Sequence, residues 1–503
     1  MKISRLVMLG LGLATLVRAD ITLAPLFVDH AILQRDHALP VWGRGEPGEH
    51  VVVTFKGQSI GATAGADGRW IVYLDPVPAS AEPAELVAAG KNTVKVSDIL
   101  VGEVWLVGGQ SNMEWDVQRS INGEREVATA NYPLLRHIKV DHTIADDGPV
   151  ETTKTSGWQT ATPATAGKFS AIGYFFGRDL VKKLQIPIGI VNSTWGGTPV
   201  ESWMPGPILR KAAVWPSVNA RWQKNLAESE ERKAHWPAEY EAWKKADEAA
   251  KAAKQKNPVP PPRPNLGPGS PYALSVLFNG MIAPLQPYAL RGFLWYQGEG
   301  NWPYPSEYAE LFPAMIRSWR AGWGQGDTPF YFVQLAAWEV DEPTHRAWAW
   351  LRESQTKALA LPATGMVTAI DIGDPKDIHP RNKQEVARRL ALIAKNRIYG
   401  IASDYEGPEF DSATREGHAM RVRFRHAGGG LISYDKPVQS LELAGADKVF
   451  HPATAKIDRG TLLVTSPAVK EPVAVRYAWS NAPIANLYNG AGLPCLPFRG
   501  DGF

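Results

Sequence analysis

The chain has 503 residues, which at roughly 150 residues per domain corresponds to about three domains. Its 54 Lys and Arg residues nearly balance 51 Asp and Glu residues, and a formal net charge of +3 excludes a polyanion-binding surface as the main feature. Because 44% of the residues are hydrophobic and 21% are charged, the chain is expected to be globular. A single cysteine, Cys495, excludes a disulfide framework, a cysteine-rich zinc site and an iron–sulfur cluster.

Residues 1–19 have the pattern of a signal peptide. Lys2 and Arg5 precede the apolar run 6–17, which is shorter than the ~20 residues that a membrane-spanning helix needs. Val17-Arg18-Ala19 supplies small residues at the positions that signal peptidase reads. We therefore expect cleavage after Ala19 and export to the periplasm or the extracellular space, with no membrane association afterwards. The alternative is an uncleaved amphipathic anchor.

Residues 20–100 carry short β-branched or aromatic segments separated by glycine- and proline-containing turns. These segments lie at 39–43, 51–55, 70–74 and 92–96. Strands at this spacing without helical periodicity are typical of a β-sandwich. Residues 406–503 return to strand patterns, for example at 420–424 and 462–465, and predict a second small β-domain.

Residues 101–405 alternate apolar strands with helical stretches. Such strands lie at 104–107, 188–191, 293–296 and 330–333. One helix is expected from about Pro380 to near Gly400, because proline is favoured at a helix start and glycine past its end. This alternation indicates a parallel sheet covered on both faces, in which ligands bind at the carboxyl ends of the strands. We therefore expect an α/β fold, with a three-layer α/β/α catalytic domain between two β-sandwich-like domains.

An insertion over about 207–270 interrupts the expected catalytic domain. Its part 221–256 is rich in Ala, Lys, Glu and Trp and predicts a solvated helix. The prolines between 258 and 264 predict a stiff, non-helical connector. The insertion is either a surface excursion or one wall of a substrate cleft.

Two glycine-containing segments follow apolar strands and carry candidate chemistry. In Gly108 to Met113, Ser111 lies on the turn beyond a strand, where a nucleophile is exposed at the edge of a sheet. In Asn192 to Thr198, Gly196 and Gly197 leave backbone N–H groups unshielded, as an oxyanion hole requires. Each segment taken alone is more often a simple turn.

Two further segments supply amides, acids and a base. Gln297, Glu299 and Asn301 follow the strand at 293–296 and place amide donors and a carboxylate on one loop. His379 follows an acidic segment that begins at Asp371, and a nucleophilic serine needs such a base.

The four segments present Ser, Gly-Gly, Gln/Asn and Asp-x-His in this chain order, which resembles the SGNH-type hydrolases. Within them the chain is similar to the sialate O-acetylesterase family, whose signature Gly-Gln-Ser-Asn-Met is found here at 109–113. The likeness extends to these positions: Leu33–Asp36, Pro40–Gly43, Gln297–Glu299, Asn301, Asp377–Pro380, Asn382, Lys383 and Val473–Trp479. The resemblance therefore covers almost the whole chain after the expected signal peptide.

The resemblance implies a secreted, cofactor-free carbohydrate O-acetylesterase with an SGNH-type fold. Ser111 would attack the acetyl carbonyl carbon, and His379 would take the serine proton and return it to the sugar oxygen. The substrate remains open between O-acetyl sialic acid and acetylated plant polysaccharides such as xylan, xyloglucan or pectin, because similar enzymes act on both.

The acid that orients the histidine departs from the usual pattern. It commonly lies three residues before the histidine, where this chain has Lys376. Asp377, two residues before His379, is favoured, and Glu299 from another loop is the alternative.

The oxyanion hole is expected to use the N–H of Ser111, an N–H from Gly196 or Gly197, and a side-chain amide. Gln297 is favoured for that amide, and Asn301 competes with it. Substrate contacts are expected from polar and aromatic residues near the same loops: Gln110, Asn112, Trp115, Trp195, Glu201, Trp302 and Arg381. Trp203 and Trp295 are further tryptophans near these loops that could form a sugar platform, although Trp295 lies within an expected buried strand.

Two other classes of function remain as alternatives. One is a non-catalytic carbohydrate-binding protein on an esterase scaffold, and the other is glycoside hydrolysis by Glu299 and Asp377. A metal site is not expected, because Asp377 and His379 offer only two ligands without a partner motif. No cofactor, nucleic acid or protein partner is expected.

Overall fold

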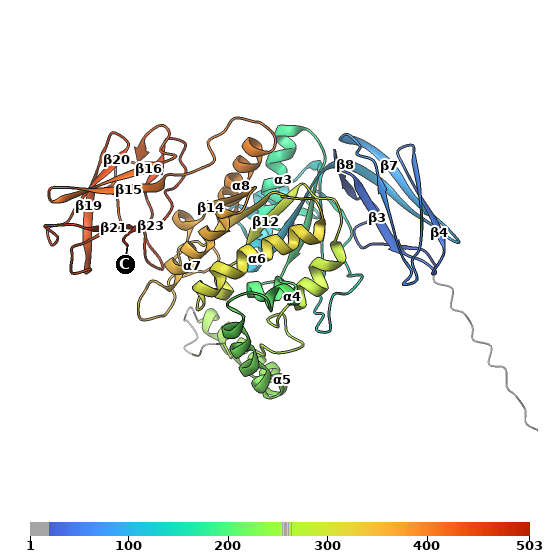
Figure 1. Cartoon of the computed structure of the whole chain (residues 1–503), viewed down its shortest axis with the longest axis horizontal. Helices are drawn as coiled ribbons and strands as arrows, with labels where there is room; N and C mark the ends of the chain where they lie inside the picture. The colour runs from blue at the N-terminus through green and yellow to red at the C-terminus, as the bar shows by residue number, and fades with distance from the viewer. Residues whose placement is uncertain (1–19, 254, 256–258, 260, 263, 503) are drawn as a thin grey trace, which may run out of the picture.

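The computed structural model describes residues 20–253, 255, 259, 261–262 and 264–502. An N-terminal group of strands, a central region of strands and helices, and a C-terminal group of strands follow one another along the long axis (Figure 1). The signal peptide expected over residues 1–19 lies outside the described residues.

The N-terminal group consists of short strands that pair antiparallel, except for the second, which pairs parallel with the long strand that follows the group. They are β1 (Thr22–Leu23), β2 (Ile32–Gln34), β3 (Leu39–Arg44), β4 (His50–Phe55), β5 (Gln58–Thr63), β6 (Arg69–Leu74) and β7 (Ser80–Ala89). Strands β1, β3 and β6 form one sheet, and β4 pairs with β5 and β7 in another. In β6 every second residue is buried, so one face of the strand packs on the core and the other faces solvent. The strands expected at 39–43, 51–55 and 70–74 are confirmed.

A single long strand, β8 (Thr93–Gly109), joins the N-terminal strands to the central sheet. Its first part pairs antiparallel with β7, and residues 103–109 pair parallel with a strand of the central sheet. Burial alternates over the first six residues and is then continuous from Ile99 to Gly109. The boundary that we expected between residues 100 and 101 therefore falls inside one strand, because no turn residue interrupts the passage from a half-buried to a fully buried environment.

The central sheet has a parallel core. Its further strands are β9 (Tyr132–Lys139), β10 (Gln159–Ala161), β11 (Ile188–Thr194), β12 (Gly292–Tyr296), β13 (Phe330–Gln334) and β14 (Thr364–Thr368). The order is β10-β9-β11-β8-β12-β13-β14, and all neighbours except β10 and β9 run parallel. This pairing confirms the expected parallel sheet, although the complete sheet is mixed because β7 and β10 join it antiparallel.

Helices contact both faces of this sheet (Figure 1). The helices of the central region are α1 (Ser111–Glu114), α2 (Gly123–Ala128), α3 (Ala171–Leu184), α4 (Gly206–Leu209), α5 (Trp215–Ala252), α6 (Pro305–Trp323), α7 (Ala347–Thr356) and α8 (Lys383–Arg397), of which α1, α3, α6, α7 and α8 contact the sheet. Trp105 of β8 packs on Phe176 of α3, whereas Trp295 of β12 packs on Trp319 of α6. Among the described residues, no helix is both long and apolar enough to cross a membrane.

Two of these helices refine the sequence predictions. Helix α8 begins at Lys383 and not at Pro380, because the Asn382 side chain caps it by accepting a hydrogen bond from the N–H of Glu385 at 3.2 Å. Helix α5 of the insertion begins six residues before the predicted start at 221 and projects from the central region (Figure 1).

The C-terminal group forms a separate antiparallel sheet. Its strands are β15 (Glu409–Glu416), β16 (Ala419–Arg425), β17 (Leu431–Ile432), β18 (Leu441–Ala444), β19 (Phe450–Asp458), β20 (Thr461–Thr465), β21 (Ala474–Tyr477), β22 (Tyr488–Asn489) and β23 (Phe498–Gly500). Seven of them pair in the order β15-β16-β20-β19-β18-β21-β23, and β17 pairs with β22. A second apolar core that includes Val422, Leu443 and Tyr477 lies under this sheet.

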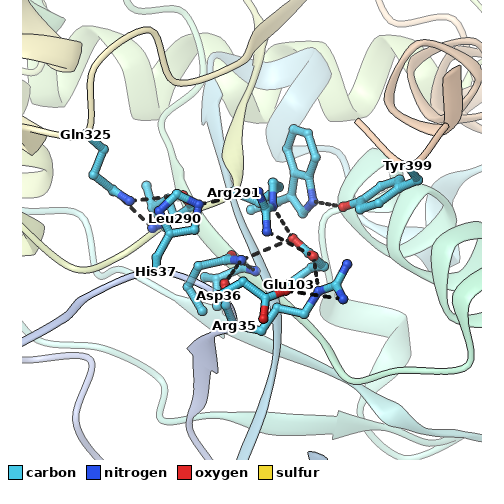
Figure 2. A network of polar contacts seen from close by, with 11 residues as sticks. Arg35, Asp36, His37, Glu103, Leu290, Arg291, Gln325 and Tyr399 are labelled. Carbon is cyan, nitrogen blue, oxygen red and sulfur yellow. Dashed lines mark hydrogen bonds and ion pairs between the residues drawn. The ribbon is translucent and has the colours of Figure 1, made fainter. Parts of the chain in front are cut away.

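A buried ion cluster ties the N-terminal strands to the central sheet (Figure 2). The Glu103 side chain on β8 is fully buried and accepts hydrogen bonds from Arg35 Nε and Arg291 Nε, each at 2.5 Å. Gln34 Nε2 donates to the same carboxylate at 3.2 Å. Because Gln34 and Arg35 come from the N-terminal group and Arg291 directly precedes β12, one carboxylate holds the two regions together.

Candidate active site

Three neighbouring parallel strands end at the same level and define the edge where the candidate residues meet. In the pairing register, Gly109 of β8 lies opposite Thr194 of β11 on one side and Tyr296 of β12 on the other. The segments that follow the three strands therefore leave the sheet side by side. This edge is the one at which the sequence predicts the catalytic residues.

The turn after β8 requires glycine. Gly109 has a φ of +128°, and a Cβ atom at this position would lie 2.2 Å from the carbonyl oxygen of Tyr296. The turn places Ser111 at the first position of the four-residue helix α1, where it is half-buried.

Ser111 and His379 form a hydrogen-bonded dyad. Nε2 of His379 lies 2.9 Å from Oγ of Ser111, although 268 residues separate them along the chain. His379 lies between β14 and α8, and the ring of Trp115 stacks on the imidazole with centroids 5.2 Å apart. The guanidinium of Arg119 covers the Trp115 ring at 4.3 Å. This is the spacing of a serine nucleophile and its general base.

Of the two candidate acids, Asp377 lies against the histidine. Oδ1 of Asp377 is 3.6 Å from Nδ1 of His379 and also accepts the backbone N–H of His379 at 2.8 Å. Glu299 is instead bound to Asn112, whose Nδ2 donates to Oε1 of Glu299 at 2.6 Å. Of the two acids, Asp377 is therefore the one in contact with the imidazole, whereas one oxygen of Glu299 is bound by Asn112.

The environment of His379 favours its neutral form. Burial lowers the pKa of His379, the positive charge of Lys383 lowers it further, and the negative charge of Asp377 opposes both. A neutral imidazole at physiological pH can accept the serine proton.

A buried polar network lies beneath the dyad. The amide of Asn112 links Glu299 to Lys383, since Nζ of Lys383 donates to Oδ1 of Asn112 at 2.5 Å. Nδ2 of Asn112 also donates to the carbonyl oxygen of Ile378, the residue before His379, at 3.0 Å. Burial raises the pKa of Glu299, and burial lowers the pKa of Lys383 to about 7. The network holds the histidine loop against the serine helix.

The N–H groups of Ser111 and Gly197 fit the expected oxyanion hole. In the described part of the chain, no hydrogen bond uses either of these N–H groups. The N–H of Gly196 is occupied, because it donates to Oε2 of Glu114 at 2.8 Å. Because its N–H is already bound, Gly196 is not the oxyanion-hole donor, and Gly197 is the member of the expected pair whose N–H is free among the described residues.

The two side-chain amides proposed for the oxyanion hole stabilise a loop instead. Nε2 of Gln297 donates to the carbonyl oxygen of Thr198 at 3.2 Å and to Oδ1 of Asn301 at 2.7 Å. Nδ2 of Asn301 donates to Oε2 of Glu201 at 2.7 Å. These buried donors are therefore already paired within the protein.

Three polar residues that we expected to contact substrate are buried. Oε1 of Gln110 accepts the N–H of Gly300 at 3.0 Å, and Asn112 belongs to the network described above. Glu201 forms an ion pair with Arg221 at 2.6 Å. Asn112, Glu201 and Oε1 of Gln110 thus bind other parts of the protein and help to position the loops around the serine.

The expected aromatic and basic contacts are only partly available. Trp203 and Trp295 are fully buried and so cannot contribute to a sugar platform, and the half-buried Trp302 packs against the main core. Trp195 stacks on His142 at 4.0 Å, and Trp115 covers the catalytic histidine. Arg381 is exposed, and its Nε donates to the carbonyl oxygen of Arg119 at 3.0 Å.

A second ion cluster beside the serine was missed from the sequence. Glu114 lies three residues after Ser111 and accepts hydrogen bonds from Lys139 Nζ and His142 Nε2, each at 3.0 Å. Although burial raises the pKa of Glu114, hydrogen bonds and charge from His142 and Lys139 bring it to about 2. The permanent carboxylate fixes the loop at Gly196. Its position one helical turn after the nucleophile was the signal available in the sequence.

No group of three or more metal-ligating side chains is found among the residues that the structure describes.

Comparisons with known proteins agree with this geometry. A family model described as "Carbohydrate esterase, sialic acid-specific acetylesterase" matches residues 275–394. The sialate O-acetylesterase of Rattus norvegicus is 32% identical over 93% of this chain and 92% of its own length. The human sialate O-acetylesterase is 31% identical over 75% of this chain and 71% of its own. The crystal structure of a carbohydrate acetylesterase from Xanthomonas citri superposes with a TM-score of 0.81, at 39% identity, over 96% of this chain and all of that one.

Fold and site together define a carbohydrate O-acetylesterase, a carboxylic ester hydrolase. The chain belongs to the sialate O-acetylesterase family. The alternative of a non-catalytic carbohydrate-binding protein is thereby set aside.

Proposed function

We propose that the chain removes O-acetyl groups from sugars by a serine acyl-enzyme mechanism in which Ser111 is the nucleophile, His379 the general base and Asp377 the acid that orients it. The observation that carries the proposal is the 2.9 Å contact between Ser111 Oγ and His379 Nε2. The contact between Asp377 Oδ1 and His379 Nδ1 supports the role of Asp377, because it stabilises the imidazolium that forms during the reaction.

The reaction follows from these positions. His379 takes the proton from Ser111 as Oγ attacks the acetyl carbonyl carbon, and the N–H groups of Ser111 and Gly197 stabilise the oxyanion. The tetrahedral intermediate collapses, the bond to the sugar oxygen breaks, and His379 protonates that oxygen. Water then attacks the acetyl-enzyme with His379 as base, which releases acetate and restores the serine.

The substrate is an O-acetylated sugar. The names of the relatives support O-acetyl sialic acid as the first candidate, and an acetylated plant polysaccharide is the alternative with the same chemistry.

The fold and location of the chain complete the proposal. We assign the central region to the three-layer α/β/α SGNH-type fold, because helices contact both faces of a parallel core. The pattern at residues 1–19 supports export of the protein, and N-terminal sequencing of the protein recovered outside the cytoplasm tests it by showing whether the chain begins at Asp20.

Acetate release from 4-nitrophenyl acetate and from an acetylated sugar tests the catalytic assignment. We expect Ser111→Ala to lower kcat/KM by about 10⁴-fold or more while far-UV circular dichroism and the melting temperature stay unchanged. Release by Ser111→Ala at the rate of the unaltered protein would refute the assignment. New reducing ends in place of acetate would instead favour glycoside hydrolysis.

A further inference from the structure

A cavity of about 320 Å³ opens at the loop after β11, which adjoins the proposed catalytic serine. Its lining includes Gly197, whose N–H we assign to the oxyanion hole, and Gly300, whose N–H binds Gln110 next to Ser111. A Cβ atom at Gly196 would lie 3.3 Å from Cβ of Ser111, so this loop is in van der Waals contact with the nucleophile. The cavity therefore begins one residue away from the reacting atoms, and its volume lies in the range of small-molecule sites.

Three aromatic side chains from separate segments line this cavity. Trp222 lies on helix α5 of the insertion, Tyr272 follows the proline-rich connector, and Tyr304 directly precedes α6. Trp222 and Tyr272 are half-buried, and Tyr304 is 37% exposed. The Tyr272 hydroxyl lies 3.3 Å from the position of a Cβ atom at Gly197, so the aromatic wall reaches the oxyanion loop.

The polar part of the wall is rigid and its charges are balanced. The Arg221 guanidinium lies 3.9 Å over the Tyr304 ring and forms ion pairs with Glu201 at 2.6 Å and Glu307 at 2.8 Å. Glu201 also accepts a hydrogen bond from Asn301, so the same chain of contacts runs to the loop after β12. Arg221 and Lys224 carry two positive charges, and Glu201 and Glu307 carry two negative ones, so the lining residues together with Glu307 behind Arg221 have no net charge.

Aromatic faces beside a balanced set of hydrogen-bonding groups match the chemistry of a sugar ring. The C–H bonds on one face of a pyranose are positively polarised and pack on the negative face of an aromatic ring, while its hydroxyls bind polar side chains. A charge-neutral wall favours an uncharged ring.

We propose that this cavity is a subsite for an uncharged sugar glycosidically linked to the acetylated one, with Trp222 and Tyr304 as the stacking residues. The enzyme then prefers an acetylated oligosaccharide over the free acetylated monosaccharide, and the insertion supplies this preference. This assignment rests on the proposed esterase function, and it decides between the two readings of the insertion in favour of a cleft wall.

Binding in the Ser111→Ala background tests the subsite separately from catalysis. Two matched pairs are titrated by calorimetry: 9-O-acetyl-N-acetylneuraminic acid against its α-linked lactoside, and acetylated xylose against acetylated xylotriose. We expect the linked member of at least one pair to bind about tenfold more tightly than the free member, and Trp222→Ala or Tyr304→Ala to remove that gain. Tyr304→Phe keeps the ring and should keep the gain.

Trp243→Ala is the matched control, because Trp243 lies on the same helix α5 but not in the cavity. With Ser111 intact, Trp243→Ala should hydrolyse 4-nitrophenyl acetate at the unaltered rate, and unchanged far-UV circular dichroism and melting temperature show that Trp222→Ala and Tyr304→Ala fold. Equal affinity for the free and linked members of both pairs overturns the subsite, as does a gain that survives both ring deletions. Loss of Ser111-dependent hydrolysis would overturn the proposed function and leave the binding result standing.

Discussion

Glu103 and Glu299 are both buried, at opposite ends of the central sheet, but their hydrogen-bond partners differ. Glu103 binds two arginines directly, each at 2.5 Å. Glu299 binds the amide of Asn112, and its Oε2 has no hydrogen-bond partner among the described residues. Lys383 reaches only the other end of that amide. The charge of Glu103 is therefore balanced by two direct ion pairs, whereas the amide of Asn112 lies between Glu299 and Lys383.

The difference separates stability from function. Glu103 stabilises the contact between the N-terminal strands and the central sheet, because its removal would leave Arg35 and Arg291 without their ion-pair partner. A buried carboxylate without a direct ion pair is costly, and burial raises the pKa of Glu299 accordingly. This unfavourable burial occurs where the network holds Ile378 next to His379, the proposed general base.

Of the substitutions at these two glutamates, Glu103→Ala is expected to change the free energy of unfolding most. The substitution leaves Arg35 and Arg291 without their shared partner, and we expect the free energy of unfolding to fall by about 3 kcal/mol. Urea unfolding monitored by tryptophan fluorescence measures the change. Because the active site lies at the other end of β8, kcat/KM of the folded enzyme should stay within about twofold.

Glu151→Ala is the matched control for this prediction. Glu151 also binds two arginines, Arg44 at 2.6 Å and Arg69 at 2.7 Å, but its side chain is 40% exposed. We expect a loss of less than about 1 kcal/mol, because solvent screens exposed ion pairs. Equal losses for the two variants would show that burial does not distinguish these clusters.

The parts of the site that local patterns specify were predictable from the sequence. Polar segments that follow apolar strands are expected at one edge of a parallel sheet, and the register of β8, β11 and β12 places Ser111 there. The 2.9 Å contact between Ser111 and His379 agrees with that expectation. The continuity of β8 was not predicted. The composition changes near residue 100 and predicts a domain boundary there, but no turn separates the two halves of the strand.

The partners of the polar side chains were not predictable in this way. Gln297 and Asn301 carry the right donors after the right strand, but the sequence does not show that each donor is already bound within the loop. Lys383 is typical of a solvated charge in the first turn of a helix, yet it is fully buried beside the histidine loop. Long-range contacts decide both cases.

A second prediction contrasts the two acids near the histidine. We expect Asp377→Asn to lower kcat/KM by roughly 10- to 100-fold, less than for a buried triad acid, because half of the Asp377 side chain is exposed to screening solvent. Glu299→Gln should cost less than about tenfold, since the amide oxygen of glutamine can still accept from Asn112. Initial rates on 4-nitrophenyl acetate measure both, and the reverse ranking would return the orienting role to Glu299.

The smallest expected effect is on the pH dependence of kcat/KM, which reports the pKa of His379. The positive charge of Lys383 lowers the pKa of His379, so Lys383→Met should raise that pKa. Activity requires the neutral imidazole, and the acidic limb of the kcat/KM profile should therefore move to higher pH. Asp377→Asn removes a negative charge that raises the same pKa, so its limb should move to lower pH.

Lys376→Met controls for the loss of a lysine from the same segment. Lys376 is exposed three residues before His379, and solvent screens its charge, so its limb should stay in place. At neutral pH we expect Lys383→Met to change kcat/KM by less than about fivefold. A limb that moves equally in both lysine variants would show that the buried network does not tune the histidine. If the acidic limb moves in Lys383→Met but not in Lys376→Met, and in the opposite direction to that of Asp377→Asn, then the buried network of Glu299, Asn112 and Lys383 tunes the pKa of His379.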